Sequence, residues 1–339
     1  MNTIYYVGLD VHKKTINYCV KQLDGTKLQE DRLPATRLAL DGWCKQLPGP
    51  WMGALEATMF TEWIYDHLKP QSVDLKVAHS ARVKALLAGK KKNDRIDAET
   101  LADLLRCNLL PQVHMMPTPL RELRRLLRYR HLLVRQSTQL KNRMAGLLMQ
   151  GGIEYNKQKL HGQRYFQQLI ENLEGVPESV VDLLKMGRQS LEFLKSLEKR
   201  LIHSLMDNES LHQRVDLLQS IPSVGLMTAL TWALEIGDVK RFPSISQAVS
   251  YCGLTSTLRE SAGKQRRMPL SRQRNKYLQY MLIEAAKLAP RFYPPLDQLY
   301  QREKQKSNPN QATLNVARKL VAYLMAVDRR QRPFEPPSP

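Results

Sequence analysis

The chain has 339 residues, and its 52 lysines and arginines against 32 aspartates and glutamates give a formal net charge of +20. That excess favours a polyanionic partner, nucleic acid in particular, over a neutral one. The basic residues are spread along the chain rather than beside one apolar helix, which argues against a membrane surface as the partner. No apolar run is long enough to span a membrane and the first residues lack a signal-peptide pattern, so we expect a cytoplasmic protein.

Cysteine and histidine show no pattern typical of a zinc site or of a disulfide-stabilised domain. The four cysteines are far apart and form no Cys-x-x-Cys pair, and the eight histidines form no cluster with ligand spacing. We therefore expect free thiols in a reducing compartment. Any bound metal would be held by oxygen ligands.

The first 115 residues alternate strand-like and helix-like segments. Residues 4–10 form a short β-rich run that ends at Asp10. Two more strand-like runs follow, separated by the turn signal Asp24-Gly25, which indicates a three-stranded meander. These two runs are residues 15–21 and 27–33. Further strands are predicted at 51–57 and 73–79, and helices at 36–47 and 61–68. The pattern predicts a mixed α/β sheet in a domain of residues 1–115.

A helical arm is predicted for residues 116–212. Leu126, Leu133, Leu140 and Leu147 recur every seven residues, Gly151-Gly152 interrupts the pattern, and residues 178–206 resume it. This spacing is typical of an antiparallel helical hairpin or coiled coil.

Basic residues crowd the first half of the arm. Few acids balance them within residues 121–150, so contact with phosphate is as good an explanation as a solvated helix face. The candidate contacts there are Arg124, Arg128 and Arg135.

Residues 213–330 are predicted to form a mostly α-helical domain. The stretch 217–237 reads as two helices around a Pro-Ser-Val-Gly turn, a pattern shared by the helix-hairpin-helix, whose turn offers N–H groups to a phosphate, and by an ordinary corner between helices. A very basic loop is predicted from Arg259 to Lys276. The Pro-rich residues 331–339 are predicted to be a disordered tail.

Four acidic residues occupy positions suited to metal binding. Asp10 and Glu56 end strands, while Asp94 and Asp97 are about one turn apart on a predicted helix. Carboxylates gathered in this way can bind Mg²⁺, and two such ions can stabilise the entering and leaving oxygens of a phosphodiester. The alternative is structural, because Asp97 can pair with a basic neighbour on the surface and Glu56 can cap the following helix.

Basic residues accompany both candidate sites. Next to the aspartate pair, the candidate phosphate contacts are Lys90, Lys91, Lys92 and Arg95. Further along the chain, Ser261 lies in a Ser-Ala-Gly turn, and cations close to a serine stabilise the charge that develops when its hydroxyl attacks phosphorus. The cations around this turn are Arg259, Lys264, Arg266 and Arg267. The alternative is a flexible basic loop whose serine is only solvated.

The acidic residues and the serine lie in sequence motifs whose order along the chain resembles that of a known protein family. YVGLDVHKKT contains the first aspartate, ALEAT the glutamate and KNDRIDAETLADLLR the closing pair. IPSVGLMTALTWALEIGDVKRFPSISQAVSYCGL and the serine-containing basic segment follow. Over nearly its whole length the chain resembles insertion-sequence transposases with an Asp-Glu-Asp-Asp tetrad, which are relatives of the pilin-inverting site-specific recombinases.

The resemblance implies a RuvC-like (RNase H-like) N-terminal domain in which Asp10, Glu56, Asp94 and Asp97 bind magnesium, two ions per site. It implies a coiled-coil arm used in assembly and a C-terminal domain whose Ser261 becomes linked to a DNA phosphate during strand exchange. It also implies a homo-oligomer, from dimer to tetramer, and a structured noncoding guide (bridge) RNA that pairs with double-stranded donor and target DNA. Such a bacterial or archaeal enzyme would be nucleoid-associated.

The chain departs from the family pattern at several positions. Ala262 follows Ser261, where glycine is usual in the family. Arg274 takes the first place of a Gly-Asn or Gly-Asp pair, Gln279 replaces a usual arginine, and Ser223 stands where glycine is frequent.

Two other functions fit parts of the pattern. A metal-only nuclease, such as a Holliday junction resolvase, would use the acidic tetrad with water as nucleophile. A non-catalytic scaffold that binds RNA or DNA would need only the positive charge and the coiled coil.

Overall fold

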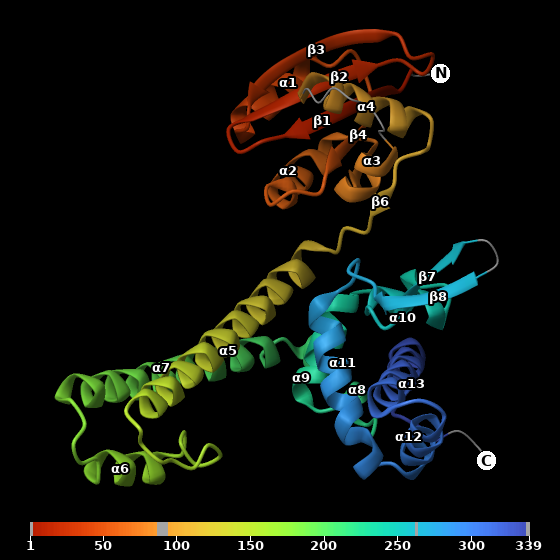
Figure 1. Cartoon of the computed structure of the whole chain (residues 1–339). Helices are drawn as coiled ribbons and strands as arrows, with labels where there is room; N and C mark the ends of the chain where they lie inside the picture. Colours follow the sequence, from red (N-terminus) through yellow and green to blue (C-terminus); the bar gives the residue numbers. More distant parts are fainter. Residues whose placement is uncertain (1–2, 87–93, 262–263, 337–339) are drawn as a thin grey trace. The chain divides into compact units, whose positions relative to one another are not determined.

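The computed structural model describes residues 3–86, 94–261 and 264–336. The chain separates into two compact units, Met1–Thr118 and Pro119–Pro339. Each unit has its own buried core (Figure 1). Within the described ranges, no helix is both long and apolar enough to cross a membrane.

A six-stranded mixed sheet with the order β3-β2-β1-β4-β5-β6 forms the centre of the first unit. The first three strands form an antiparallel meander, β4 and β5 run parallel to β1, and β6 is antiparallel to β5. The strands are β1 (Tyr5–Val11), β2 (Thr15–Lys21), β3 (Lys27–Pro34), β4 (Trp51–Glu56), β5 (Asp74–Ala78) and β6 (Gln112–Val113). The predicted meander and mixed sheet are confirmed.

Helices cover both faces of this sheet, because side chains alternate along each strand. These helices are α1 (Arg37–Gln46), α2 (Thr61–Leu68), the short 3-10 helix η1 (Lys69–Gln71), α3 (Ser80–Leu86) and α4 (Asp94–Arg106). Leu40 of α1 and Ile64 of α2 pack in one core with Val7 of β1. Leu101 of α4 packs with Ala54 of β4 in a second, smaller core.

Gly8 allows α4 to lie directly against β1. A Cβ atom at Gly8 would be 1.9 Å from the carbonyl oxygen of Ala98 and 2.6 Å from the amide nitrogen of Ala102. No side chain fits in that space, so the backbones of the helix and the strand are in contact.

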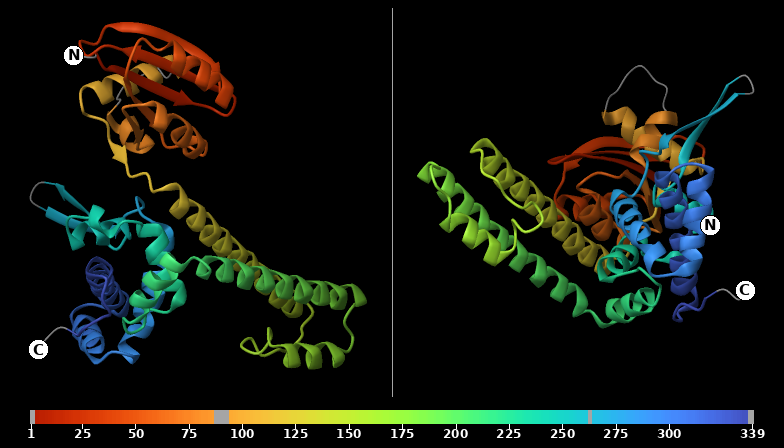
Figure 2. Two further views of the ribbon diagram at one scale, coloured as in Figure 1. Left: turned by 180° about the vertical axis from the view of Figure 1, so that it is seen from behind. Right: turned by 60° about the horizontal axis from the view of Figure 1, so that its bottom comes forward.

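Two long helices form an antiparallel hairpin in the second unit (Figure 2). A Cβ atom at Gly187 would lie 2.9 Å from Met144 Cγ, and further along the hairpin Arg130 pairs with Glu198. Residue numbers therefore rise along one helix as they fall along the other, which confirms the predicted hairpin; the coiled coil stays a prediction. The helices are α5 (Thr118–Gln150) and α7 (Glu178–Met206), with α6 (Gln163–Glu171) in the connection.

The remaining helices of the second unit enclose a core that includes Trp232, which is fully buried. Leu127 and Leu205 of the hairpin belong to the same core, so the hairpin is packed onto these helices. The helices are α8 (Glu209–Gln219), α9 (Leu226–Ile236), η2 (Val239–Arg241), α10 (Ile245–Tyr251), α11 (Lys276–Leu288), η3 (Ala289–Arg291), α12 (Pro294–Lys306) and α13 (Pro309–Arg330).

The basic segment predicted as a loop is largely a β-hairpin. Strands β7 (Ser256–Ser261) and β8 (Lys264–Leu270) pair antiparallel, with Arg259 opposite Arg266. The prediction of a loop is therefore wrong for this part of the segment. Pairing satisfies the backbone of a two-stranded hairpin whatever the polarity of its side chains, so composition did not reveal it.

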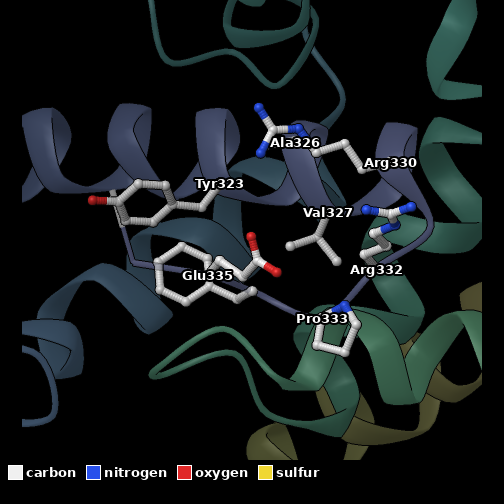
Figure 3. Close-up of a pocket in the computed structure, with 8 residues that line it drawn as sticks. Tyr323, Ala326, Val327, Arg330, Arg332, Pro333 and Glu335 are labelled. Atoms are coloured by element: carbon white, nitrogen blue, oxygen red, sulfur yellow. The ribbon is translucent and has the colours of Figure 1, made fainter. Parts of the chain in front are cut away.

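The C-terminal tail is partly folded. The Phe334 ring lies 4.9 Å from that of Tyr323 and 5.8 Å from that of Tyr293, measured between centroids. Its backbone N–H donates a 2.7 Å hydrogen bond to Ser220 Oγ. Figure 3 shows the pocket of about 410 Å³ that the tail forms with the end of α13. The prediction of disorder is wrong for residues 331–336, because one aromatic anchor outweighs their Pro-rich composition.

The turn between α8 and α9 contains a residue in the left-handed region. Ser223 has a φ of 72°. Glycine adopts this conformation without steric penalty. The resemblance implies glycine at this position, and serine therefore holds the turn with some backbone strain.

We predict that Gly8→Ala destabilises the first unit by about 1–3 kcal/mol, because the added methyl group overlaps the backbone of α4. Gly42→Ala is the control, because a Cβ atom there meets nothing within 4 Å and alanine favours the interior of α1. Urea denaturation measures both variants. Equal stability of the two would show that α4 does not contact β1 at Gly8.

Candidate functional site

Asp10 and Glu56 lie at the carboxyl ends of neighbouring parallel strands. β1 and β4 pair in register as far as Leu9 opposite Leu55, which brings Asp10 beside Glu56 at the next position. Residues two apart on a strand face the same side. Asp10 therefore shares the face of Gly8, which is the face that α4 covers.

Helix α4 runs antiparallel to β1. Near the C-terminal end of α4, Arg106 donates a 3.2 Å hydrogen bond to the carbonyl of Leu23, in the turn after β2 and thus beside the start of β1. Nearer its N-terminal end, Ala98 lies against Gly8 in the middle of β1. The first turn of α4 therefore lies towards the carboxyl end of β1, where Asp10 is located.

Asp97 continues the buried face of α4 in that direction. The buried residues of α4 recur at helical spacing and are Ala98, Leu101, Ala102 and Leu105. Asp97 precedes Leu101 by four residues, and Asp94 precedes Ala98 by four. We call Asp10, Glu56, Asp94 and Asp97 the acidic edge. The side chain of Asp94 lies outside the described part of the structure.

Ion pairs with the meander hold α4 in this position. Lys21 Nζ is 2.8 Å from Glu99 Oε1 and 2.7 Å from Asp103 Oδ2, and Lys27 Nζ is 2.8 Å from Glu99 Oε2. Burial lowers the pKa of Lys21, but hydrogen bonds with Asp103 and Glu99 outweigh it and hold that pKa above its ordinary value. Hydrogen bonds from Lys21 and Lys27 lower the pKa of Glu99. Glu99 and Asp103 are therefore structural acids of α4.

His12 lies next to the acidic edge and was not singled out from the sequence. Its Nε2 atom is 3.0 Å from Asp10 Oδ2. An imidazole at this distance can orient the carboxylate or share a proton with it. Its spacing from Asp10 could have indicated it. Residues two apart in an extended strand face the same side of the sheet, so His12 was a candidate neighbour of the Asp10 side chain.

The acidic edge offers carboxylate oxygens, the ligands that Mg²⁺ prefers. Among the side chains that the structure describes, no three aspartate, glutamate, histidine or cysteine residues are grouped closely enough to hold a metal ion. Asp10, Glu56 and Asp97 are therefore not gathered into a metal-holding group, although their donor type fits magnesium; the side chain of Asp94, the fourth predicted ligand, belongs to the undescribed part. Lys90, Lys91 and Lys92 also lie outside the described residues, as does the side chain of Arg95.

The predicted nucleophile lies at the end of the β7–β8 hairpin in the second unit. Backbone pairing sets Ser261 opposite Lys264. The structure does not describe the side chains of Ser261, Arg259, Lys264, Arg266 and Arg267. Their roles in catalysis and phosphate contact stay predictions.

Acids from distant segments compensate two arginines of α5. Arg128 forms a bidentate pair with Glu235, with Nε 2.7 Å from Oε1 and Nη2 2.8 Å from Oε2. Hydrogen bonding to Glu235 raises the pKa of Arg128. Arg130 pairs with Glu198 of α7. The count of acids within α5 alone therefore missed these two partners, and the phosphate contact of Arg128 stays a prediction.

The other two arginines predicted to contact phosphate lie on the same helix. Arg135 is exposed and Arg124 is half-buried. Their predicted contacts with nucleic acid stay predictions. Sequence reasoning also missed Glu235, although a single acid within the apolar run LTWALEIG was a usable signal.

Comparison with known protein families gives a match in each unit. A family model described as a transposase matches residues 7–152, which contain the whole acidic edge. The model of the transposase IS116/IS110/IS902 family matches residues 215–301, which contain Ser261 and Glu235.

Several similar proteins have transposase names. The chain is 25% identical over 302 residues to the transposase for insertion sequence element IS1328 of Yersinia enterocolitica, covering 85% of this chain and 84% of the relative. It is 28% identical over 204 residues to the transposase for IS1111A of Coxiella burnetii, covering 58% and 54%. It is 24% identical over 244 residues to the transposase for IS1533 of Leptospira borgpetersenii, covering 69% and 70%. The family matches fall in both units and the relatives agree with them, so the chain is similar to transposases of the IS116/IS110/IS902 family.

Proposed function

We propose that this protein is a transposase that cuts and rejoins the DNA of an insertion sequence with a magnesium-binding acidic edge and a serine nucleophile, Ser261. The observation that supports it best is that Asp10 and Glu56 are neighbours on the face of the sheet that α4 covers, while Asp97 lies in the first turn of α4. A meander followed by parallel strands also supports an RNase H-like fold for the first unit.

The chemistry divides between the two groups. Asp10, Glu56, Asp94 and Asp97 would hold magnesium, which would supply charge stabilisation for the phosphodiester oxygens. The Ser261 oxygen bonds to phosphorus as the bond to the leaving deoxyribose oxygen breaks, and the serine proton passes to that leaving oxygen. Attack on the serine phosphodiester by the hydroxyl of another strand reverses the step, so joining needs no external energy source.

Assembly and RNA guidance complete the proposal. On α7, Leu183, Met186 and Phe193 are 50%, 60% and 63% exposed and recur at helical spacing, which supports a homo-oligomer formed through the arm. The net charge of +20 supports contact with a structured guide RNA in addition to donor and target DNA.

We predict that Ser261→Ala abolishes the covalent protein–DNA adduct and strand rejoining while DNA binding is retained, because only the nucleophilic oxygen is lost. Denaturing gel electrophoresis of protein with labelled DNA measures the adduct. Ser256→Ala, at the other end of β7, is the control and should behave as the parent chain does. A Ser261→Ala chain that cleaves DNA at the parent rate would favour the metal-only nuclease instead.

We predict that Asp97→Asn stops strand transfer with little loss of stability, because the acidic edge loses a charged ligand and no lysine pair is broken. Glu99→Gln, two residues away on α4, should lower the thermal unfolding midpoint and retain strand transfer in the folded chain, because the Lys21–Asp103 pair and the Gly8 contact still hold α4. Titration with Mn²⁺ followed by calorimetry should show weaker binding for Asp97→Asn alone. Unchanged strand transfer and Mn²⁺ binding in that variant would remove Asp97 from the site.

We predict that Arg135→Glu weakens nucleic-acid binding and lowers the slope of log K against log salt by about 1, the value for one lost phosphate contact. Lys287→Glu is the control, because it changes the net charge equally on α11, outside the arm. Fluorescence anisotropy at several salt concentrations gives both slopes. An unchanged slope for Arg135→Glu would identify Arg135 as part of a solvated face.

A further inference from the structure

Helix α9 buries a carboxylate whose charge must be compensated inside the protein. Glu235 is 0% exposed and lies in an otherwise apolar helix. Its carboxylate accepts two hydrogen bonds from Arg128 and one of 2.7 Å from Asn275 Nδ2. A buried charge is tolerated only when it is paired and hydrogen-bonded. Separating Arg128 or Asn275 from Glu235 would leave the buried carboxylate without that partner, and this free-energy cost keeps both side chains in place.

Asn275 connects this carboxylate to the segment that follows the β7–β8 hairpin. Its Oδ1 atom accepts hydrogen bonds from the backbone of Tyr277 at 3.1 Å and Leu278 at 3.2 Å and so caps α11. One side chain therefore determines where α11 begins and contacts Glu235 at the same time.

The segment before the hairpin is connected to the same group. The Tyr251 hydroxyl donates a 3.1 Å hydrogen bond to the backbone carbonyl of Glu235, and the Tyr251 carbonyl accepts 3.0 Å from the Asn275 N–H. Thr255 and Ser271, at the base of the hairpin, are joined by a 3.1 Å backbone hydrogen bond. Both ends of the hairpin are thereby tied to α9.

Two departures from the family pattern strengthen this base. Gln279 Nε2 donates a 2.6 Å hydrogen bond to the carbonyl of Gly253. The side chain of Arg274 covers Gly253 so closely that a Cβ atom there would lie 2.5 Å from Arg274 Cβ. The side chains of Arg274 and Gln279 therefore hold the segment after the hairpin against Gly253, in the segment before it.

We propose that Glu235 is a positioning residue for the β7–β8 hairpin and, resting on the proposed function, for Ser261 at the end of β7. Arg128 supplies the compensating charge from α5, so Glu235 connects the base of the hairpin to α5 as well as to α9. Glu235 itself touches no substrate in this role. Its loss changes where the serine stands rather than how strongly DNA binds.

The same unit contains a second buried pair, which reaches α9 through Trp232; among the described residues, Asp328 has no hydrogen bond to the segments that flank the hairpin. Asp328 of α13 is 4% exposed and accepts hydrogen bonds of 2.8 Å and 2.7 Å from Arg214. Trp232 Nε1 donates a further 2.9 Å hydrogen bond to it. Asp328→Asn thus reports the effect of losing a buried charge of this kind on stability alone.

The experiment compares Glu235→Gln with Asp328→Asn in the full chain. Both should lower the thermal unfolding midpoint. Only Glu235→Gln should slow Ser261–DNA adduct formation at saturating DNA, by about 10- to 100-fold for a nucleophile displaced by about 1 Å, with unchanged DNA affinity. Equal adduct rates in the two variants, measured where both are folded, would overturn the positioning role.

A second variant covers the case in which Glu235→Gln does not fold. Asn275→Ser keeps a side chain that can cap α11 but removes the amide donor to Glu235. It should slow adduct formation and speed backbone hydrogen exchange in β7 and β8, whereas Asp328→Asn should do neither. Exchange and adduct rates equal to those of Asp328→Asn would overturn the proposal.

Ser261→Ala, measured in parallel, separates the two hypotheses. Strand rejoining at the parent rate in that variant would overturn the proposed function. An inactive Ser261→Ala, combined with Glu235→Gln and Asn275→Ser variants that match Asp328→Asn, would overturn the positioning role alone.

Discussion

The contact between the backbones of α4 and β1 is the constraint on which the acidic edge depends. Because Gly8 has no side chain, Ala98 and Ala102 reach the strand itself. The contact determines the distance of α4 from the sheet, and the lysine pairs to Glu99 and Asp103 determine its position along the strand. Asp10 and Glu56, on neighbouring strands, therefore lie on the face of the sheet against which α4 packs.

In the second unit, buried charged residues fix the positions of the helices. Glu235 and Asp328 each lie in a helical core and each is compensated by an arginine from a segment more than 100 residues away in sequence. A buried apolar contact tolerates small shifts, whereas a buried carboxylate requires its donors at hydrogen-bond distance. Such pairs therefore specify how helices are placed relative to one another as well as contributing to stability.

Sequence reasoning succeeded where the signal was local. The meander, the alternating helices and strands, and the arm helix at residues 178–206 follow from side-chain periodicity and turn residues, which act over a few positions. It failed for the β7–β8 hairpin, for the anchoring of Phe334 and for the partner of Arg128. For Phe334 and Arg128 the partner comes from more than 100 residues away, and no local pattern records it. The hairpin is local, but it is held by backbone pairing, which its basic composition does not reveal.

The sequence by itself determined the order of the acids, the serine and the basic residues around them, and that order predicts which residues carry the chemistry without coordinates. Only the tertiary structure distinguished the acids of α4 from one another. Glu99 is bound by Lys21 and Lys27, whereas Asp97, two residues earlier on the same helix, does not take part in these pairs. The physical reason is the helical repeat: residues two apart face different directions, so the side chain of Glu99 meets the meander and that of Asp97 faces elsewhere.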